Sequence, residues 1–295
     1  MDGILNINKA TSMTSHDVVA RVRKTLHQRR VGHAGTLDPA ASGVLPICVG
    51  HGTRVAEYLS ESGKAYQAEI TFGIVTDTYD AEGSITRTAD PGNLTQASIE
   101  EALPRFLGLQ MQSPPRYSAI KIQGQPAYKR VRSGEEITLE ARSIEIYQLQ
   151  ILAWDAPKLT LAVECSKGTY IRSLAYDLGE YLSCGAHLSA LIRTRSGPFT
   201  LATSITLEQL AEASEQGTIA NYLFAPDSVL QEYTALTLDA ATIARVLHGN
   251  AFRSEDPQPT TDLARIYDTE GHFLAIATWD HQHQQWQPKK VFSGS

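Results

Sequence analysis

The residue with the most distinctive chemical setting is Asp38, which lies in the segment Gly32–Pro46. Three glycines and two prolines in these fifteen residues predict a stiff, sharply turned loop. Because Asp38 precedes Pro39, its backbone is biased towards an extended conformation, which can hold the carboxylate in one direction. Such a carboxylate can serve as a nucleophile or a base. Asp-Pro pairs also occur in ordinary turns, so the spacing alone leaves a structural role open.

A second candidate is Arg172, in the first turn of an expected helix. Ile171, Leu174 and Leu178 give this helix its apolar spacing. A cation at a helix start opposes the helix dipole, so an arginine buried there needs an anion as its partner. Asp38 is the kind of partner it needs, and an adjacent guanidinium would keep a buried carboxyl ionised. The alternative is that Arg172 reaches out to solvent.

Five further residues deserve a role or a structural explanation: Lys9, His33, Tyr66, Tyr170 and Leu191. Tyr66 begins an alternating strand on its inward face, and Tyr170 directly precedes Arg172. Either tyrosine can stack on a ligand ring or simply pack in the core. His33, in a polar glycine-containing loop, is a turn residue or a side chain that stacks on bases. On pattern alone, Leu191 reads as a core leucine and Lys9 as a surface lysine.

Several classes of protein are excluded by what the sequence lacks. Cys48, Cys165 and Cys184 are far apart, so neither a disulfide framework nor a zinc site is indicated. The glycine-rich segment matches neither of the common phosphate-binding motifs. The first residues do not resemble a signal peptide, and no apolar run reaches the ~18 residues that a membrane span needs. We therefore expect a protein of the reducing cytoplasm.

The charge is unevenly distributed along the chain. The formal net charge is −6, which taken alone argues against a nucleic-acid partner. However, residues 196–295 hold 5 basic and 12 acidic residues, whereas residues 1–195 hold 21 and 20. One basic run covers 21–30, and a second, over 113–132, contains no acid. Its members are Arg116, Lys121, Lys129, Arg130 and Arg132, with Tyr117 and Tyr128 between them. Such runs are often solvated faces, but cations beside aromatics also suit unpaired bases.

The elements that must position these residues follow from periodicity. Alternating residues predict strands over 66–72 and 159–165, and helical spacing after the Thr14-Ser15 cap predicts a helix to about residue 26. Ser98 and Glu101 fit a capping box. Strands and helices mix without a regular parallel-sheet rhythm, which favours an α+β fold for residues 1–230. From residue 236 the texture changes to an Asp239-capped helix and short strands, so we expect a separate small domain over 236–295.

Seven segments within residues 2–230 carry a common pattern: Asn8-Lys9 with Thr14–Asp17, Gly32–Pro46, Lys64–Tyr66, Thr76–Gly83, Pro114–Lys121, Gly168–Arg172 and Arg193–Phe199. In this order and spacing they resemble the bacterial TruB family of tRNA pseudouridine-55 synthases. The tail is similar to the PUA-like RNA-binding module that closes many of these enzymes. One departure is that Ala10 and Ser12 replace the proline and glycine usual in the first motif, which affects the rigidity of that loop.

The resemblance implies a fold, an activity and a set of partners. The fold is a mixed, mainly antiparallel sheet flanked by helices, followed by a β-rich PUA-like domain. The activity is isomerisation of uridine 55 in the T-loop of tRNA to pseudouridine, with flipping of the base, and without metal, cofactor, guide RNA or protein partner. A monomer is the default. The alternative is a T-arm-binding tRNA folding factor with little or no catalysis.

The resemblance also implies roles for individual residues. Asp38 is the catalytic nucleophile, Arg172 pairs with it, and Tyr66 stacks on the target base and can take a proton. Substrate contacts fall to His33, which enters the T-loop, to Tyr170 and Leu191, which line the uracil pocket, and to Lys9. The segment 116–137 matches a mobile loop that clamps RNA, with Arg116, Lys121, Lys129 and Arg130 as its cations. Whether Asp38 attacks C1′, adds to C6 or removes a C2′ proton stays open.

Overall fold

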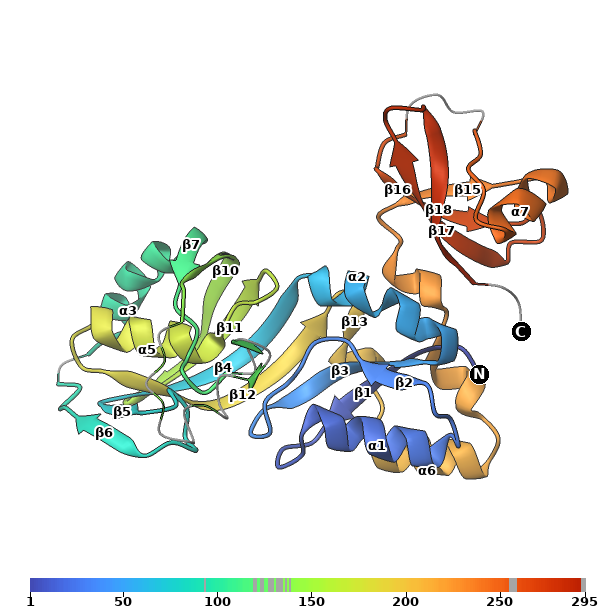
Figure 1. Ribbon diagram of the computed structural model, residues 1–295. Coiled ribbons are helices and arrows are strands. Elements are labelled where there is room, and N and C mark those ends of the chain that lie inside the picture. Colours follow the sequence, from blue (N-terminus) through green and yellow to red (C-terminus); the bar gives the residue numbers. More distant parts are fainter. Residues whose placement is uncertain are drawn as a thin grey trace.

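The computed structural model describes residues 1–292 except 93, 119–120, 123–124, 127–129, 131–134, 136, 138 and 255–258. For residues 121, 122 and 126 it describes the backbone alone. Figure 1 shows a long main body carrying the N-terminus and a smaller C-terminal body beside one of its ends. No helix among the described residues is long and apolar enough to cross a membrane.

The main body is built on a ten-stranded sheet. Its strand order is β14 (Leu223–Phe224), β1 (Gly3–Lys9), β3 (Ser42–Val49), β12 (Ala186–Ser196), β4 (Lys64–Phe72), β11 (Lys158–Cys165), β10 (Arg142–Asp155) and β7 (Gly108–Gln112). Two short strands, β2 (Val31–His33) and β13 (Phe199–Thr200), pair with β3 and β12. Within the described part of this sheet only the β3–β12 pairing is parallel. The expected mixed, mainly antiparallel sheet is therefore confirmed.

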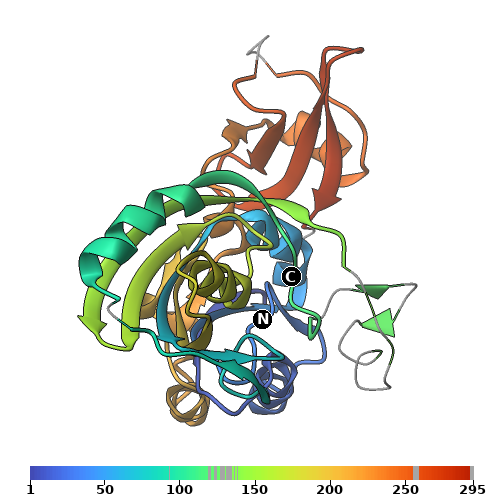
Figure 2. The ribbon, with the colours of Figure 1, turned by 90° about the vertical axis from the view of Figure 1, so that its left-hand side faces the viewer.

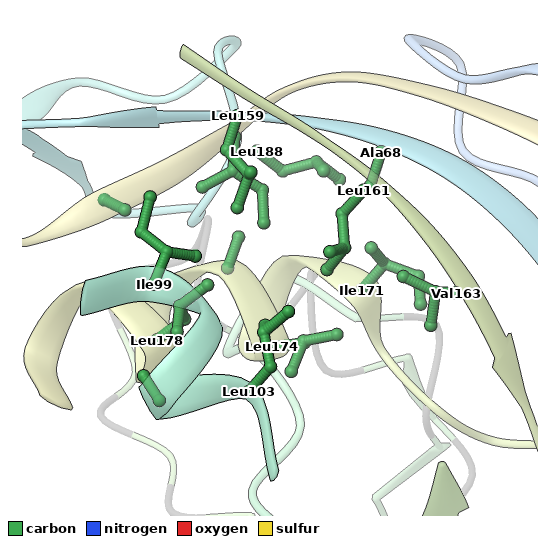
Figure 3. Packing of buried hydrophobic residues seen from close by; sticks show 14 of the residues in the cluster. Ala68, Ile99, Leu103, Leu159, Leu161, Val163, Ile171, Leu174, Leu178 and Leu188 are labelled. Atoms are coloured by element: carbon green, nitrogen blue, oxygen red, sulfur yellow. The ribbon is translucent and has the colours of Figure 1, made fainter. Parts of the chain in front are cut away.

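The apolar faces of the helices explain how they pack on this sheet. Helix α5 (Ile171–Tyr181) and helix α3 (Gln96–Ala102) cover β4, β11 and β12, with Leu161, Leu174 and Ile99 in one buried cluster (Figure 3). Helix α1 (Ser15–Thr25) packs its valines against β1 and β3, next to α6 (Leu207–Glu215). The predicted Thr14 cap of α1 is present, with Asp17 completing a capping box.

One predicted cap is wrong. Ser98 does not begin α3 with Glu101 as its partner, because Thr95 caps the helix and Ser98 is the third helical residue. The Thr95 hydroxyl accepts a hydrogen bond from the Ser98 amide, and the Ser98 hydroxyl accepts one from the Thr95 amide. Thr95 fits the usual pattern only at its first position, and the Ser98 hydroxyl fills the place expected for a Glu or Gln side chain.

The smaller body has a four-stranded sheet of its own, in the order β15 (Thr234–Thr237), β16 (Leu263–Tyr267), β17 (Phe273–Asp280) and β18 (Gln285–Val291). Helix α7 (Ala240–Leu247) packs on it through Val246, against the buried Trp286. Figure 2 shows this body projecting from the main one. At the junction, Lys290 pairs with Glu57 at 2.7 Å. The helix expected after Asp239 is confirmed, and short strands follow it as expected, among them β16 and β17.

The remaining elements are short. They are helix α2 (Ala56–Glu61), the strands β5 (Ile74–Thr76), β6 (Ile85–Thr88), β8 (Lys121–Ile122) and β9 (Gln125–Pro126), and the 3₁₀ turns η1 (Gly50–Val55), η2 (Leu103–Phe106), η3 (Leu201–Thr203), η4 (Ile219–Tyr222) and η5 (Pro226–Val229). The β5–β6 hairpin encloses a tight loop, residues 77–84, which matters for the site described below.

The sheet under α5 should be the main source of stability. Leu161 on β11 is completely buried, so Leu161→Ala should lower the free energy of unfolding by about 2–5 kcal/mol through lost burial and a cavity. Leu152, on the neighbouring strand β10, is 49% exposed, and Leu152→Ala is the matched control. Urea unfolding followed by circular dichroism gives both values, and equal losses in the two variants would contradict this assignment of the core.

Candidate active site

A cavity of about 220 Å³ lies at one side of the sheet, between the Asp38 loop and the start of α5. Five residues singled out in the sequence line it: Asp38, Tyr66, Tyr170, Arg172 and Leu191. They come from a loop, two adjacent strands and a helix start, and are separated by up to 153 positions in the chain. The fold therefore brings the predicted catalytic and base-binding residues to one place.

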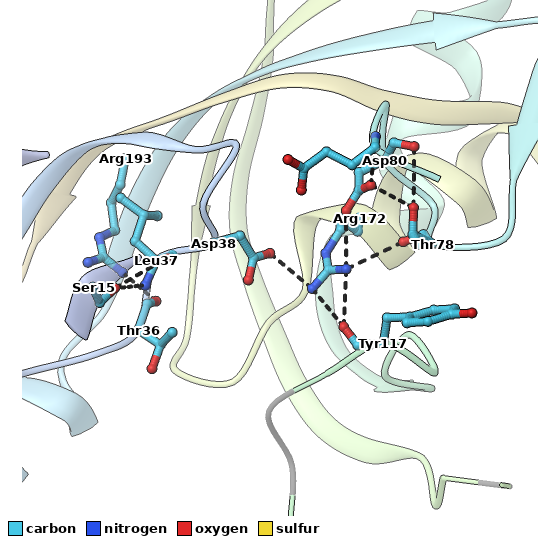
Figure 4. Close-up of polar contacts among 10 residues, drawn as sticks. Ser15, Thr36, Leu37, Asp38, Thr78, Asp80, Tyr117, Arg172 and Arg193 are labelled. Carbon is cyan, nitrogen blue, oxygen red and sulfur yellow. Dashed lines mark hydrogen bonds and ion pairs between the residues drawn. The ribbon is translucent and has the colours of Figure 1, made fainter. Parts of the chain in front are cut away.

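The predicted ion pair between Asp38 and Arg172 is present. An Arg172 Nη2 atom lies 2.9 Å from Asp38 Oδ2, and Nη1 lies 3.2 Å from Asp80 Oδ2 (Figure 4). The guanidinium also donates to the carbonyl oxygens of Thr78 and Tyr117, at 3.3–3.4 Å. The Arg172 side chain is 9% exposed, whereas that of Asp38 is 45% exposed. The cation is thus buried and fully engaged, while the carboxylate still faces the cavity.

Asp80 is a member of this network that the sequence reasoning did not identify. It lies in the loop inside the β5–β6 hairpin, where its Oδ1 accepts hydrogen bonds from the Thr78 hydroxyl at 2.6 Å and the Glu82 amide at 3.1 Å. These bonds turn its other oxygen towards Arg172. The available signal was the acidic turn Thr76–Gly83, which carries part of the family resemblance, but nothing in that pattern points to a distant arginine.

The Asp38 loop is tied to the N-terminus of α1. The Ser15 hydroxyl accepts a hydrogen bond from the Leu37 amide at 2.9 Å and donates one to the Leu37 carbonyl at 3.0 Å. On the other side of Asp38, the Ala41 amide donates to the Asp38 carbonyl at 3.1 Å. These contacts fix the backbone on both sides of the carboxylate, as the composition of the loop predicted.

Two tyrosines line the cavity. Tyr66 is half-buried on β4, and burial raises the pKa of its phenol, so the hydroxyl is protonated at neutral pH. Tyr170 is the residue at the start of α5, and burial raises its pKa as well. The Gln112 side chain holds Tyr170 by accepting from its amide at 2.8 Å and donating to its carbonyl at 3.1 Å. Leu191, on β12, lines the same cavity and packs against the buried cluster under α5.

Lys9 is buried, although its sequence pattern predicts a surface lysine. Its side chain is completely buried, and Nζ donates to the carbonyls of Ala10, Met13 and Pro39 at 2.8–3.3 Å. It is not among the residues that line the cavity. Composition alone could not reveal this, because the carbonyls that bind the ammonium come from two loops that only the fold brings together. Lys9 therefore braces the loop that follows Asp38 and does not itself face the cavity.

His33 ends β2 and is half-buried. Burial lowers its pKa below the usual 6.5, so the ring is neutral at pH 7. Its Nδ1 atom is buried and has no hydrogen-bond partner among the described residues. A neutral, half-buried ring at the start of the Asp38 loop is a suitable group for stacking on a base.

The expected basic clamp is only partly described. Arg116 is exposed, and the carbonyl of the next residue, Tyr117, accepts from Arg172, so the start of the segment is anchored at the site. Arg130 pairs with Glu135 at 2.6 Å. Lys129 and the side chain of Lys121 lie outside the described residues, as do Tyr128 and Arg132. In the described part of the chain, no group of histidine, cysteine and acidic residues could hold a metal ion.

The buried ammonium of Lys9 predicts an unusual dependence of stability on pH. Burial lowers its pKa from 10.5 to about 8. Between these values the unfolded chain binds more protons than the folded protein, so the Lys9 contribution to the free energy of unfolding rises with pH, by about 3 kcal/mol across the window. In Lys9→Met this rise should disappear, as measured by urea unfolding at several pH values. Exposed Lys24→Met is the control, and parallel pH curves for wild type and Lys9→Met would contradict the burial of the ammonium.

Comparison with known proteins agrees with this geometry. Residues 23–171 match the family model described as TruB family pseudouridylate synthase (N terminal domain). Residues 172–231 match the tRNA pseudouridylate synthase B C-terminal domain, and residues 234–291 match Pseudouridine synthase II TruB, C-terminal.

Curated relatives and solved structures extend the match over the whole chain. A tRNA pseudouridine synthase B of Symbiobacterium thermophilum is 46% identical and covers 85% of this chain and 83% of its own. A tRNA pseudouridine synthase B of Dehalococcoides mccartyi is 42% identical, and the match covers 99% of this chain and 97% of the relative. A solved H/ACA RNP bound to a substrate RNA containing 2′-deoxyuridine superposes with a TM-score of 0.75 at 25% identity, over 99% and 85% of the chains. A solved Cbf5-Nop10-Gar1 complex superposes with a TM-score of 0.75 at 27% sequence identity, and the match covers 98% of this chain and 84% of the other. With family models matching nearly its full length and relatives this similar, the chain belongs to the TruB family of pseudouridine synthases.

Proposed function

We propose that this protein isomerises uridine 55 in the T-loop of tRNA to pseudouridine, with Asp38 as the residue that acts on the target nucleotide. The observation that carries the assignment is the accessible Asp38 carboxylate, paired with a buried arginine at the edge of a cavity lined by tyrosines. The tRNA substrate follows from the relatives, which are named tRNA pseudouridine synthase B at 41–46% identity. A tRNA substrate implies work in the cytoplasm.

The cavity suits a single base. At about 220 Å³ it is smaller than the ~300–1,000 Å³ typical of sites for drug-sized ligands, so it has room for one ring that enters from outside but not for a dinucleotide. A base reaches such a cavity only by leaving its stack, which costs a few kcal/mol. Stacking on Tyr66 and contact with Leu191 would offset part of this cost, and His33 would occupy the space that the base leaves.

The reaction breaks the N1–C1′ bond, turns the base and joins C5 to C1′. It involves no net oxidation or reduction, and every atom except the C5 proton stays on the nucleotide. Asp38, paired with Arg172, can attack C1′, add to C6 or remove a C2′ proton. The Tyr66 phenol lies across the same cavity, where it can stack on the ring and exchange a proton with it.

For partners, we propose that the chain works as a monomer on tRNA alone. Residues 116–137 would close on the T-arm, with Arg116, Lys121, Lys129 and Arg130 on phosphates. The PUA-like domain, residues 236–295, would hold a second part of the RNA. The identity to the proteins of the H/ACA RNP and the Cbf5-Nop10-Gar1 complex is 25–27%, whereas the relatives named tRNA pseudouridine synthase B are 41–46% identical, which favours direct recognition of tRNA without a guide.

Replacing Asp38 tests the assignment most directly. Asp38→Asn should abolish tritium release from T-arm RNA labelled at C5 of uridine, because an amide cannot act as nucleophile or base. Exposed Asp155→Asn, on β10, removes the same charge far from the cavity and should keep wild-type activity.

Two other results would count against the proposal. Full activity of Asp38→Asn would remove Asp38 from the mechanism. Tight binding of tRNA by wild-type protein that forms no pseudouridine by mass spectrometry would instead favour a tRNA folding factor.

The charge distribution predicts how binding depends on salt. The net charge is −6, and the cations at the site are mostly buried, so few phosphates should be contacted and the affinity should come largely from shape and the flipped base. The log–log slope of affinity for a T-arm hairpin against KCl should therefore be shallower than about −6. Fluorescence anisotropy measures it, and a slope of about −6 or steeper would contradict the prediction.

A further inference from the structure

Arg193 is a buried cation beside the cavity that the reaction as described does not use. It lies on β12 with 1% of its surface exposed, and it lines the same cavity as Asp38 and Tyr66. On the neighbouring strand, Tyr66 is its register partner. Directly opposed residues of an antiparallel pair place their side chains on the same face, so the Arg193 and Tyr66 side chains lie side by side.

The guanidinium holds both ends of the Asp38 loop. Nη2 donates to the Gly35 carbonyl at 3.1 Å and Nη1 to the Thr36 carbonyl at 3.2 Å, just before Asp38. Nε donates to the Val44 carbonyl at 2.7 Å, after the loop has returned to β3. Each nitrogen thus binds a different carbonyl. The planar, three-armed shape of arginine allows this, whereas the single ammonium of lysine cannot reach the same three directions.

The backbone of Arg193 meets the same loop. Gly43 is its parallel register partner, and a Cβ atom on Gly43 would lie 2.3 Å from the Arg193 carbonyl oxygen. Gly43 also has a φ of +105°, in the region that favours glycine. The close approach of β3 to β12 therefore requires a glycine at this position, and it brings the end of the loop within reach of the Arg193 side chain.

The charge of Arg193 is unusual for a purely structural contact. Among the described residues no carboxylate lies within ion-pair distance of it, and its bonds are to neutral carbonyls. A buried charge without an ionic partner is costly, so a neutral side chain would serve better if filling space were the only need. Burial raises the pKa of the Tyr66 phenol, and the positive charge of Arg193 opposes part of that rise.

We propose that Arg193 is a positioning residue for the reaction, which fixes the Asp38 loop against the strand that carries Tyr66, so that both groups face one base. This positioning role rests on the proposed function only in that the rate to be measured is that of pseudouridine formation. Loss of the guanidinium fork should let the loop shift relative to β4. A misplacement of this kind slows chemistry by about tenfold to a hundredfold without a matching loss of substrate binding.

Arg193→Lys tests this, with Arg195→Lys as the matched control on the same strand. Arg195 is 34% exposed and pairs with Glu164 at 2.8 Å. Arg193→Lys should lower the single-turnover rate constant on a T-arm hairpin at least tenfold and change its dissociation constant by less than about threefold. Hydrogen exchange of the amides in 35–44 should become faster by about tenfold, and that elsewhere should not. Arg195→Lys should leave all three quantities unchanged.

Each other outcome is decisive. A normal rate for Arg193→Lys, or a slow rate with unchanged exchange in 35–44, would overturn the positioning role. If Arg193→Lys fails to fold, Gly43→Ala keeps the arginine but displaces the end of the loop. It should show the same slow rate and fast exchange, and a normal rate there would also overturn the inference. If wild-type protein forms no pseudouridine, the proposed function fails, while the exchange measurement still reports whether Arg193 holds the loop.

Discussion

The site depends on one buried guanidinium. Arg172 joins three segments that are distant in the chain: the Asp38 loop, the Asp80 hairpin and the start of the clamp segment, through the Tyr117 carbonyl. Of its two carboxylate partners only Asp80 is largely buried, and removing such a partner typically costs about 3–5 kcal/mol because the guanidinium charge is left uncompensated. Asp80 and two carbonyls satisfy the buried side of the cation. Asp38 is the one member open to the cavity, so its carboxylate can react while its charge stays balanced.

The scaffold divides the task of positioning between rigid and less rigid elements. Tyr66 and Leu191 lie on adjacent central strands, and Arg172 lies on a helix packed over the same sheet, so their places follow from the core. Asp38 lies on a loop and needs further support. That support comes from the Ser15 hydroxyl, from Lys9 through the Pro39 carbonyl and from the Arg193 fork. The loop that carries Asp38 is therefore held by side chains from three other parts of the chain, α1, β1 and β12.

The sequence could predict features that follow from a local pattern or from one charge that needs a partner. It could not predict contacts among several groups that only the fold brings together. The Asp38–Arg172 pair was predictable, because a cation in the first turn of an apolar helix needs an anion and few loops offer a fixed one. The strands carrying Tyr66 and Leu161 followed from simple alternation. Asp80 and the burial of Lys9 were not predictable, since each depends on carbonyls or charges that only the fold brings near. The roles expected for Lys121 and Lys129 depend on a segment whose side chains the structure does not describe.

The net charge of −6 belongs to the whole chain and does not describe the surroundings of the cavity, where positive charge is in excess. Around the cavity, Lys9, Lys64, Arg172 and Arg193 are buried cations, whereas Asp38 and Asp80 are the carboxylates in contact with Arg172. Lys64 donates to the Ser60 carbonyl at 2.7 Å, and burial lowers its pKa to about 8, so it still carries most of its charge at neutral pH. Such a local positive excess is poorly screened by salt because it is buried, but exposed acids elsewhere cancel it at long distance. The protein should therefore attract RNA weakly from afar and hold it strongly once a base has entered, which places its selectivity in the docked complex and not in the encounter.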